Sequence, residues 1–375
     1  MMTYARSRLW VGILSVGTWV IISTTLLFTI ENLHEYFRTL SLIQSILIFL
    51  GLYVLISMPF DFVGGYFLPK KYERSKQSLF SFVASYIRGV FFHCVFLFLI
   101  AYIILYLLKT DELSNLFLPI LLIIFSIQIL LALFQAQIAK LLANLKRSDS
   151  SDVSQSYEVW ESSDIGFTGG IPFLSQKTIL PKNWTLNFSP DEIQQLLNRR
   201  KFLKEKHSHL LGIGGAILFN LIGVAIGYAG CLYIGISLSP HGYLSFLLVW
   251  ASSVSLWSFL GLLVLPSFSQ KATLFGDQSW KKGDQNKITK LIEELDAFQD
   301  QEPKRQEQIQ RIFHPIASVD LRVRALEIDQ EISNGAWHIA RYTLFYSWSI
   351  LSFMGRAVHC NVGRPDLWVF LPSDG

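Results

Sequence analysis

The sequence predicts an α-helical multi-span integral membrane protein with six spans, a seventh candidate span and a small α+β module in the cytosol. Hydrophobic residues make up 51% of the chain and charged residues 16%, whereas a soluble domain carries about a quarter charged residues. The apolar residues also gather in long segments, each exceeding the roughly 18 to 20 residues that a helix needs to cross the hydrocarbon core. These segments are residues 9–30, 40–60, 89–108, 114–138, 209–237 and 242–266.

The first four segments form a membrane block over residues 1–138. Residues 9–30 are too long for the apolar core of a signal peptide, and no small-residue cleavage pattern follows, so we expect a retained span. Basic residues precede this span and fill the loop between the second and third spans. By the positive-inside rule, the N-terminus and that loop are cytosolic. The basic residues are Arg6, Arg8, Lys70, Lys71, Arg74, Lys76 and Arg88.

The same topology assigns residues 139–208 and 267–335 to the cytosol. We expect a multi-pass protein whose N-terminus and main loop are cytosolic, in the inner membrane of a bacterium. The net charge of +4 reflects this topology and does not indicate a nucleic-acid partner. Cys94 and Cys231 lie inside spans and Cys360 lies near the end of the sequence, so they form neither a disulfide framework nor a CxxC metal knuckle.

Residues 139–208 predict a linker followed by strands and a helix. Residues 147–157 are rich in Ser and Asp, which indicates a flexible linker. Gly169 and Gly170 indicate a turn, and the segment KTILP after them predicts a short strand. We therefore expect a small hairpin or strand pair here.

A helix then begins at Ser189. Ser189 is placed to cap it, Pro190 suits its first position, and Glu192 completes a capping box. We expect this helix to continue into the fifth span at residue 209. Residues 209–266 form a two-span block, in which small residues favour close helix packing.

The remaining chain divides into a polar helical region, residues 267–335, and a last segment, residues 336–375. Within the seventh candidate span, residues 336–358, only residues 342–355 are uncharged, which is short for a crossing. The pattern favours a re-entrant or interfacial helix, or one packed against the other spans. A loop-like tail follows it.

Separated segments from three regions of the chain, with a further segment after the third, occur in an order typical of one family. Residues 59–89 read PFDFVGGYFLPKKYERSKQSLFSFVASYIRG, and a second pair of segments reads FTGGIPFLSQKTILPKNW and LNFSPDEIQQLL. Residues 267–278 read SFSQKATLFGDQ, and FHPIASVDLRVRAL follows. Together they resemble the CAAX prenyl proteases, integral-membrane zinc metallopeptidases with an HExxH helix and a later S-R-x-x-E-x-x-A-D element. The resemblance implies a metallopeptidase-like cytosolic module.

Carried over position by position, the resemblance implies that the catalytic groups are missing. Arg199 and Leu203 stand at the two histidine positions, and Arg200 stands at the catalytic glutamate. Thr273 stands at the third ligand, and Asp277 matches the last residue of its element. Zinc needs neutral imidazole and carboxylate ligands, and guanidinium groups do not deprotonate in proteins. No catalytic residue, metal or other cofactor is therefore expected.

The leading hypothesis is a catalytically inactive membrane metallopeptidase homologue, a pseudoprotease. It would keep the scaffold of the family to bind a membrane protein, a peptide or membrane lipids, with an oligomeric state that stays open. The alternative is an active, divergent membrane metalloendopeptidase that holds zinc with non-standard ligands.

A basic run precedes the fifth span on the cytosolic side. Its charges fit two interpretations: ordinary positive-inside charge, or a site for anionic lipid headgroups, to which each basic residue near the surface contributes about 1 kcal/mol. The lipid-binding candidates are Arg199, Arg200, Lys201, Lys204 and Lys206.

Two other clusters are weaker candidates. His207 and His209 point about 200° apart on a helix and cannot ligate one ion together, so an interfacial pair is favoured. His359 and Cys360 are adjacent, and in an extended chain adjacent side chains point to opposite faces. A structural cysteine is therefore favoured over a nucleophile.

Overall fold

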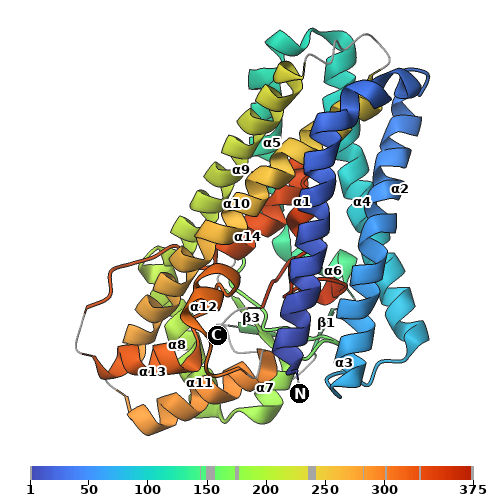
Figure 1. Ribbon diagram of the computed structural model, residues 1–375. Helices are drawn as coiled ribbons and strands as arrows, with labels where there is room; N and C mark the ends of the chain where they lie inside the picture. Colours follow the sequence, from blue (N-terminus) through green and yellow to red (C-terminus); the bar gives the residue numbers. More distant parts are fainter. Residues whose placement is uncertain are drawn as a thin grey trace.

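A computed structural model describes residues 2–143, 145–148, 157–173, 177–234, 242–281, 283–299, 302–328 and 331–372. In this part of the chain, five helices are long and apolar enough to cross a membrane, and they form the upper bundle in Figure 1. They are α1 (Tyr4–Phe37), α2 (Leu42–Phe62) with its extension to Lys71, α4 (Leu79–Thr110), α9 (Ser208–Tyr233) and α10 (Tyr243–Asp277). These helices support an integral membrane protein.

Serine residues begin two of these helices. The Ser41 side chain accepts from the backbone N–H of Gln44 and the Ser78 side chain from that of Ser81, at 3.4 and 3.2 Å. Each bond satisfies one of the first backbone donors, which lack a partner within the helix. The apolar sequence after each cap then extends the helix through the bundle.

The fourth predicted span is bent. Helix α5 (Phe117–Leu133) ends before α6 (Gln135–Leu142), and the two axes differ by 77°. The side-chain amide of Gln135 is buried and donates to the carbonyl of Val369 at 3.3 Å. The predicted span over residues 114–138 therefore corresponds to two helices with a bend between them. Counted with this bent pair as one span, the described chain has up to six candidate spans.

A small module lies at the end of the bundle where both chain termini lie (Figure 1). Its sheet has the order β1-β2-β3, in which β1 (Lys146–Arg147) pairs antiparallel with β2 (Tyr157–Glu161) and β2 pairs parallel with β3 (Thr178–Pro181). Strand β3 is the predicted KTILP strand. On the side of the predicted hairpin, β3 forms only an isolated antiparallel bridge, between Ile179 and Gly170. Most of the predicted linker, residues 147–157, lies outside the described residues.

Short helices complete the module around a second apolar core. This core contains buried Trp184, Leu196, Leu291 and Leu295, and it is separate from the core of the bundle. The helices are α7 (Lys182–Asn187), α8 (Pro190–Glu205), α11 (Gln285–Gln299), α12 (Glu307–Phe313) and α13 (Val319–Glu327).

Two boundaries differ from the prediction. Helix α8 does not run into α9, because His207 adopts the left-handed conformation with φ of 60° and turns the chain between them. Helix α10 continues past Pro266 to Asp277, so one helix belongs to both the bundle and the module. The predicted boundary between residues 266 and 267 therefore lies inside a helix.

The last segment lies inside the bundle instead of crossing it. Helix α14 (Ile339–Tyr346) has eight residues, and the short turns η4 (Ser347–Ile350), η5 (Phe353–Arg356) and η6 (Pro365–Leu367) follow it. The Trp19 and Phe353 rings stack with centroids 4.3 Å apart, which ties this segment to α1. For residues 336–358 the sequence left open a re-entrant helix, an interfacial helix, or a helix packed against the other spans. The structure agrees with the last of these.

The segment around Gly363 passes close to a π-helical turn, η1 (Val63–Phe67), that extends α2. A Cβ atom on Gly65 would lie 1.9 Å from the carbonyl oxygen of Gly363. Only glycine allows this approach of two backbones. The tail is thereby fixed between α2 and the module.

Candidate functional site

The site that the sequence singled out lies where α8 faces α10. Ser189 and Glu192 form the predicted capping box, with the Ser189 backbone N–H donating to a Glu192 carboxylate oxygen at 2.7 Å. That backbone bond, together with the Ser189 hydroxyl, lowers the pKa of Glu192. The cap fixes the start of α8, and one face of the helix then turns its side chains toward α10.

Arg199 fills the space between the two helices. Its Nε donates to Asp277 Oδ1 at 2.8 Å, and its Nη2 donates to the carbonyl oxygen of Thr273 at 3.0 Å. The Arg199 side chain is 0% exposed. Gly276 leaves the room for it, because a Cβ atom there would lie 3.1 Å from both Arg199 Nη2 and Leu203 Cδ2. The structure thus brings Arg199, Leu203, Thr273 and Asp277 together.

A second arginine completes this cluster. Arg322 on α13 donates from Nε to Asp277 Oδ2 at 2.8 Å and from Nη2 to Oδ1 at 2.9 Å. The guanidinium carbons of Arg199 and Arg322 lie 5.2 and 5.9 Å from the centroid of the Trp280 ring. We call Arg199, Asp277, Arg322 and Trp280 the arginine cluster. The sequence did not identify Arg322 or Trp280, since neither has a fixed spacing from α8.

Arg200 points to the other side of α8 and holds the sheet. Its Nη1 donates to the carbonyl oxygen of Ile179 and its Nη2 to that of Thr168, both at 2.9 Å. Its guanidinium carbon lies 5.3 Å from the centroid of the Trp184 ring. The planar guanidinium group of arginine presents several N–H donors, so it can bond to two carbonyl oxygens on separate segments at once. Arg200 therefore ties β3 and the preceding loop to α8.

The burial of these arginines corrects the lipid hypothesis. Arg199 and Arg200 are 0% and 1% exposed, so their guanidinium groups are not accessible to a headgroup. Lys201, Lys204 and Lys206 are exposed on α8 and at its end. Of the five candidates, the geometry leaves only these three lysines at the surface.

Leu203 lies in an apolar group instead of a ligand shell. It packs with Ile171, Ala272 and Trp337. The Thr273 hydroxyl donates to the carbonyl oxygen of Ser269 at 3.2 Å, one turn earlier in α10. Both side chains are 0% exposed. Leu203 has no atom that can ligate a metal ion, and the Thr273 hydroxyl is bonded to the backbone of its own helix.

These residues do not fit a zinc ion. The carboxylate at this position is Asp277, and both its oxygens accept hydrogen bonds from arginine. A guanidinium group is a permanent cation and repels a metal. Among the residues that the structure describes, no three His, Cys, Asp or Glu side chains are grouped so that they could hold a metal ion.

The other candidates also have structural roles. His209 is buried, and its Nε2 lies 2.9 Å from the carbonyl oxygen of Ile171, whereas His207 is the exposed residue of the turn. The His359 ring lies 5.2 Å from the His314 ring, and Cys360 is buried.

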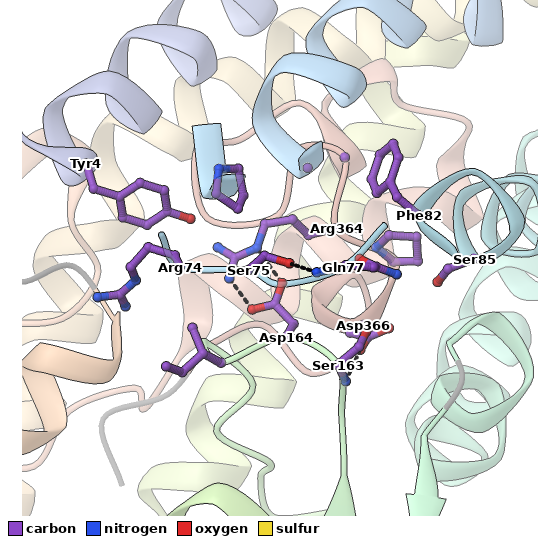
Figure 2. A pocket seen from close by; sticks show the side chains of 15 residues that line it. Tyr4, Arg74, Ser75, Gln77, Phe82, Ser85, Ser163, Asp164, Arg364 and Asp366 are labelled. Atoms are coloured by element: carbon purple, nitrogen blue, oxygen red, sulfur yellow. Dashed lines mark hydrogen bonds and ion pairs between the residues drawn. The ribbon is translucent and has the colours of Figure 1, made fainter. Parts of the chain in front are cut away.

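A polar pocket of about 30 Å³ lies where α1, the start of α4, the module and the tail meet (Figure 2). Figure 2 shows Arg364 facing Asp164, and Arg364 Nε donates to Asp164 Oδ2 at 2.6 Å. Nearby, Asp366 accepts from the backbone N–H and hydroxyl of Ser163, at 3.2 and 3.1 Å. This volume is about that of a single water molecule, which is too small for a larger ligand. We therefore interpret the polar residues around it as contacts that hold the C-terminal segment against the module.

The long apolar helices and the small module that α10 joins to them define a helical membrane protein. No family model matches the chain, and no curated protein matches it. Among solved structures, the crystal structure of Ste24p from S. mikatae is similar, with a TM-score of 0.62 over 88% of this chain and 100% of that one. The two sequences are 11% identical, so this likeness shows the fold alone. It supports the resemblance to CAAX prenyl proteases at the level of the fold.

Proposed function

We propose that this chain is a catalytically inactive relative of the membrane metallopeptidases, kept as a binding scaffold in the membrane. One observation carries the proposal. Arg199, at the position implied for a zinc-binding histidine, donates to Asp277 at 2.8 Å inside a buried cluster. Without a bound metal, nothing lowers the pKa of an attacking water from its bulk value toward about 7.

The proposal extends to what the scaffold binds. Exposed Lys201, Lys204 and Lys206 stand beside the start of α9, where a span meets the module. Such charges attract anionic lipid headgroups or an acidic segment of a membrane protein. We take anionic lipid as the first candidate, with a protein or peptide partner as the alternative.

Metal content and proteolysis test the proposal directly. Protein purified in detergent without added metal, and again after incubation with zinc, is expected to hold far less than one zinc per chain by mass spectrometry. It is also expected to leave casein and a prenylated peptide intact. One zinc per chain, lost with chelator together with proteolysis, would instead establish the active metalloendopeptidase.

Restoring the ligands is a second test. The triple substitution Arg199→His, Leu203→His and Thr273→Glu replaces the three implied ligand positions and leaves Arg200 in place. We expect zinc binding to rise while turnover stays absent, because Arg200 remains at the catalytic glutamate position and leaves the site without a general base. Arg200→Glu is left out because its carboxylate would face the carbonyl oxygens of Ile179 and Thr168.

A further inference from the structure

A large apolar cavity lies away from α8, between α1 and α10. Its volume is about 310 Å³, within the range of ligand pockets. Figure 1 shows α1 and α10 side by side, with α12 below and α14 behind them. The two spans supply most of the apolar lining, including Ile13, Val16, Phe259 and Leu262.

The cavity is accessible from the lipid-facing side of the bundle. Ile13, Val16, Phe259 and Leu262 are only partly buried, and Leu263, which also lines the cavity, is 37% exposed. These residues belong to helices that are apolar enough to cross a membrane. A ligand would therefore enter sideways from the hydrocarbon.

The inner end of the cavity is lined by basic side chains. Arg341 and His359 lie there, and both also line an adjoining polar cavity of about 10 Å³. That second cavity adds Arg8, which donates to the carbonyl oxygen of His359, and His314 and Arg364, of which Arg364 is paired with Asp164. None of the described residues that line either cavity is Asp or Glu. An apolar space that ends at arginine and histidine side chains is complementary to an amphiphile with a negative head.

The two volumes indicate which amphiphile fits. At about 30 Å³ for each water-sized group, the apolar cavity holds roughly ten chain atoms. The remaining atoms of a longer chain, such as that of palmitate, would extend through the lipid-facing opening into the hydrocarbon. The polar cavity is near the lower limit of about 10 to 15 Å³ for a single water, which is too small for a phosphate group. A carboxylate at the inner end of the apolar cavity can contact Arg341 and His359 directly.

We propose that this cavity binds a fatty acid, with its alkyl chain between α1 and α10 and its carboxylate toward Arg341 and His359. The site is separate from the arginine cluster, so the inference goes beyond the proposed function. It holds whether or not the chain binds zinc, and the two proposals are tested by different measurements.

Gly17 allows the cavity to be filled without disturbing the fold. It lines the cavity, and a Cβ atom there would have no atom within 4 Å. A Cβ atom on Gly51 of α2 would likewise have no atom within 4 Å, and Gly51 does not line the cavity. Gly17→Leu and Gly51→Leu are thus the same change in two spans, and only the first occupies the site.

The test uses purified full-length protein in phosphatidylcholine nanodiscs and a fluorescent dansyl fatty acid as the probe. Palmitate is expected to displace the probe, while methyl palmitate and lysophosphatidylglycerol displace it at least about tenfold less well, since a charge-assisted hydrogen bond is lost or the head does not fit. Gly17→Leu is expected to weaken probe binding about tenfold or more, and Gly51→Leu to leave it unchanged. Arg341→Lys should retain part of the preference for palmitate over its ester, which Arg341→Met should lose.

Several results would overturn the proposal. Equal displacement by the methyl ester would remove the role of Arg341 and His359. Equal displacement by the lysophospholipid would show a site for phosphate-bearing lipids. Equal effects of Gly17→Leu and Gly51→Leu would mean that the probe binds elsewhere, and absence of saturable binding would exclude the site.

Discussion

Asp277 accepts hydrogen bonds from two buried guanidinium groups, which makes it the anionic centre of the arginine cluster. Removal of one partner of a buried ion pair typically costs about 3–5 kcal/mol, because an uncompensated charge stays inside. Asp277→Ala leaves two arginines without this carboxylate. Arg199→Met removes one cation and leaves the pair between Arg322 and Asp277 intact.

We therefore expect Asp277→Ala to lower the Tm in nanodiscs far more than Arg199→Met does. The double variant Asp277→Ala with Arg199→Met should recover part of the loss. If Arg199→Met is as damaging as Asp277→Ala, the arginine cluster is held by packing around Arg199 and Trp280 instead of by the central carboxylate.

Two carboxylates at the polar pocket of Figure 2 have pKa values shifted in opposite directions. Burial acts to raise the pKa of Asp164, but the charge and hydrogen bonds of Arg364 outweigh it and hold that pKa below the usual value. Burial raises the pKa of Asp366, and the nearby Asp164 charge adds to this, against hydrogen bonds from Ser162 and Ser163.

The two residues should therefore contribute opposite pH dependence to stability. Asp164 stabilises the fold above its unfolded pKa of about 3.9, and this is lost as pH falls through its lowered folded pKa. Asp366 favours the fold below its unfolded pKa, and this is lost as pH rises through its raised folded pKa. We expect Asp164→Asn to lower the Tm at neutral pH, and Asp366→Asn to preserve or raise it. Tm measured across roughly pH 2 to 8 covers both transitions and checks this; changes of the same sign in both variants would contradict it.

At the scale of elements, the end of α8 carries the remaining lipid candidates. Lys201 is 74% exposed, and Lys204 and Lys206 are exposed beside it. If they bind anionic headgroups, each contributes about 1 kcal/mol, screened by salt. Replacing all three with glutamate should reduce the gain in Tm when phosphatidylglycerol replaces phosphatidylcholine in the nanodisc.

Matched changes on α11 provide the control. Lys287 and Lys290 are also exposed, but α11 lies at the end of the module away from the bundle (Figure 1). Their replacement with glutamate should leave the phosphatidylglycerol effect unchanged. If both sets of substitutions act equally, or if high salt does not reduce the effect, the α8 lysines contribute only positive-inside charge.

Local sequence signals predicted the elements well where one short motif determines them. The capping box of Ser189 and Glu192 set the start of α8, and the KTILP segment set β3. The end of α8 was wrong, because nothing in the sequence marks His207 as left-handed; a non-glycine residue there is uncommon. The bend after α5 was also missed; Gln135, at the bend, donates to Val369 far along the chain, and the local sequence does not reveal this contact.

The sequence likewise predicted the parts of the site that follow from local motifs and missed the contacts from distant segments. The family resemblance, with its register set by Asp191, Glu192 and Ile193, implied that Arg199 lies near Thr273 and Asp277, and the structure brings them together. Arg199 and Arg200 were predicted as headgroup-binding candidates, but both are buried, and charge alone does not reveal burial. Arg322, which shares Asp277 with Arg199, and Ile179, which accepts from Arg200, come from other segments of the chain.

On the scale of the whole molecule, helix α10 and contacts from the loop before α4 connect the bundle to the module. Helix α10 runs from the bundle into the module, and Arg74 donates to the last carbonyls of α11, at 2.9 Å to Ala297 and 2.7 Å to Phe298. A cation at a helix C-terminus interacts favourably with the helix dipole. The module is thereby held to the end of the bundle where α1 begins.

The orientation of this assembly in the membrane is the last prediction. Lys201 lies on the module, and Lys109 lies near the end of α4, at the opposite end of the bundle; both are exposed. The excess of basic residues before α1 and between α2 and α4 favours a cytosolic module. We expect Lys109→Cys to react with a membrane-impermeant maleimide in intact cells, and Lys201→Cys to react only after permeabilisation. Cys231 and Cys360 are buried and Cys94 is half-buried, so the unsubstituted chain gives the background. Labelling of Lys201→Cys in intact cells, with Lys109→Cys protected, would place the module on the outer side and reverse the proposed topology.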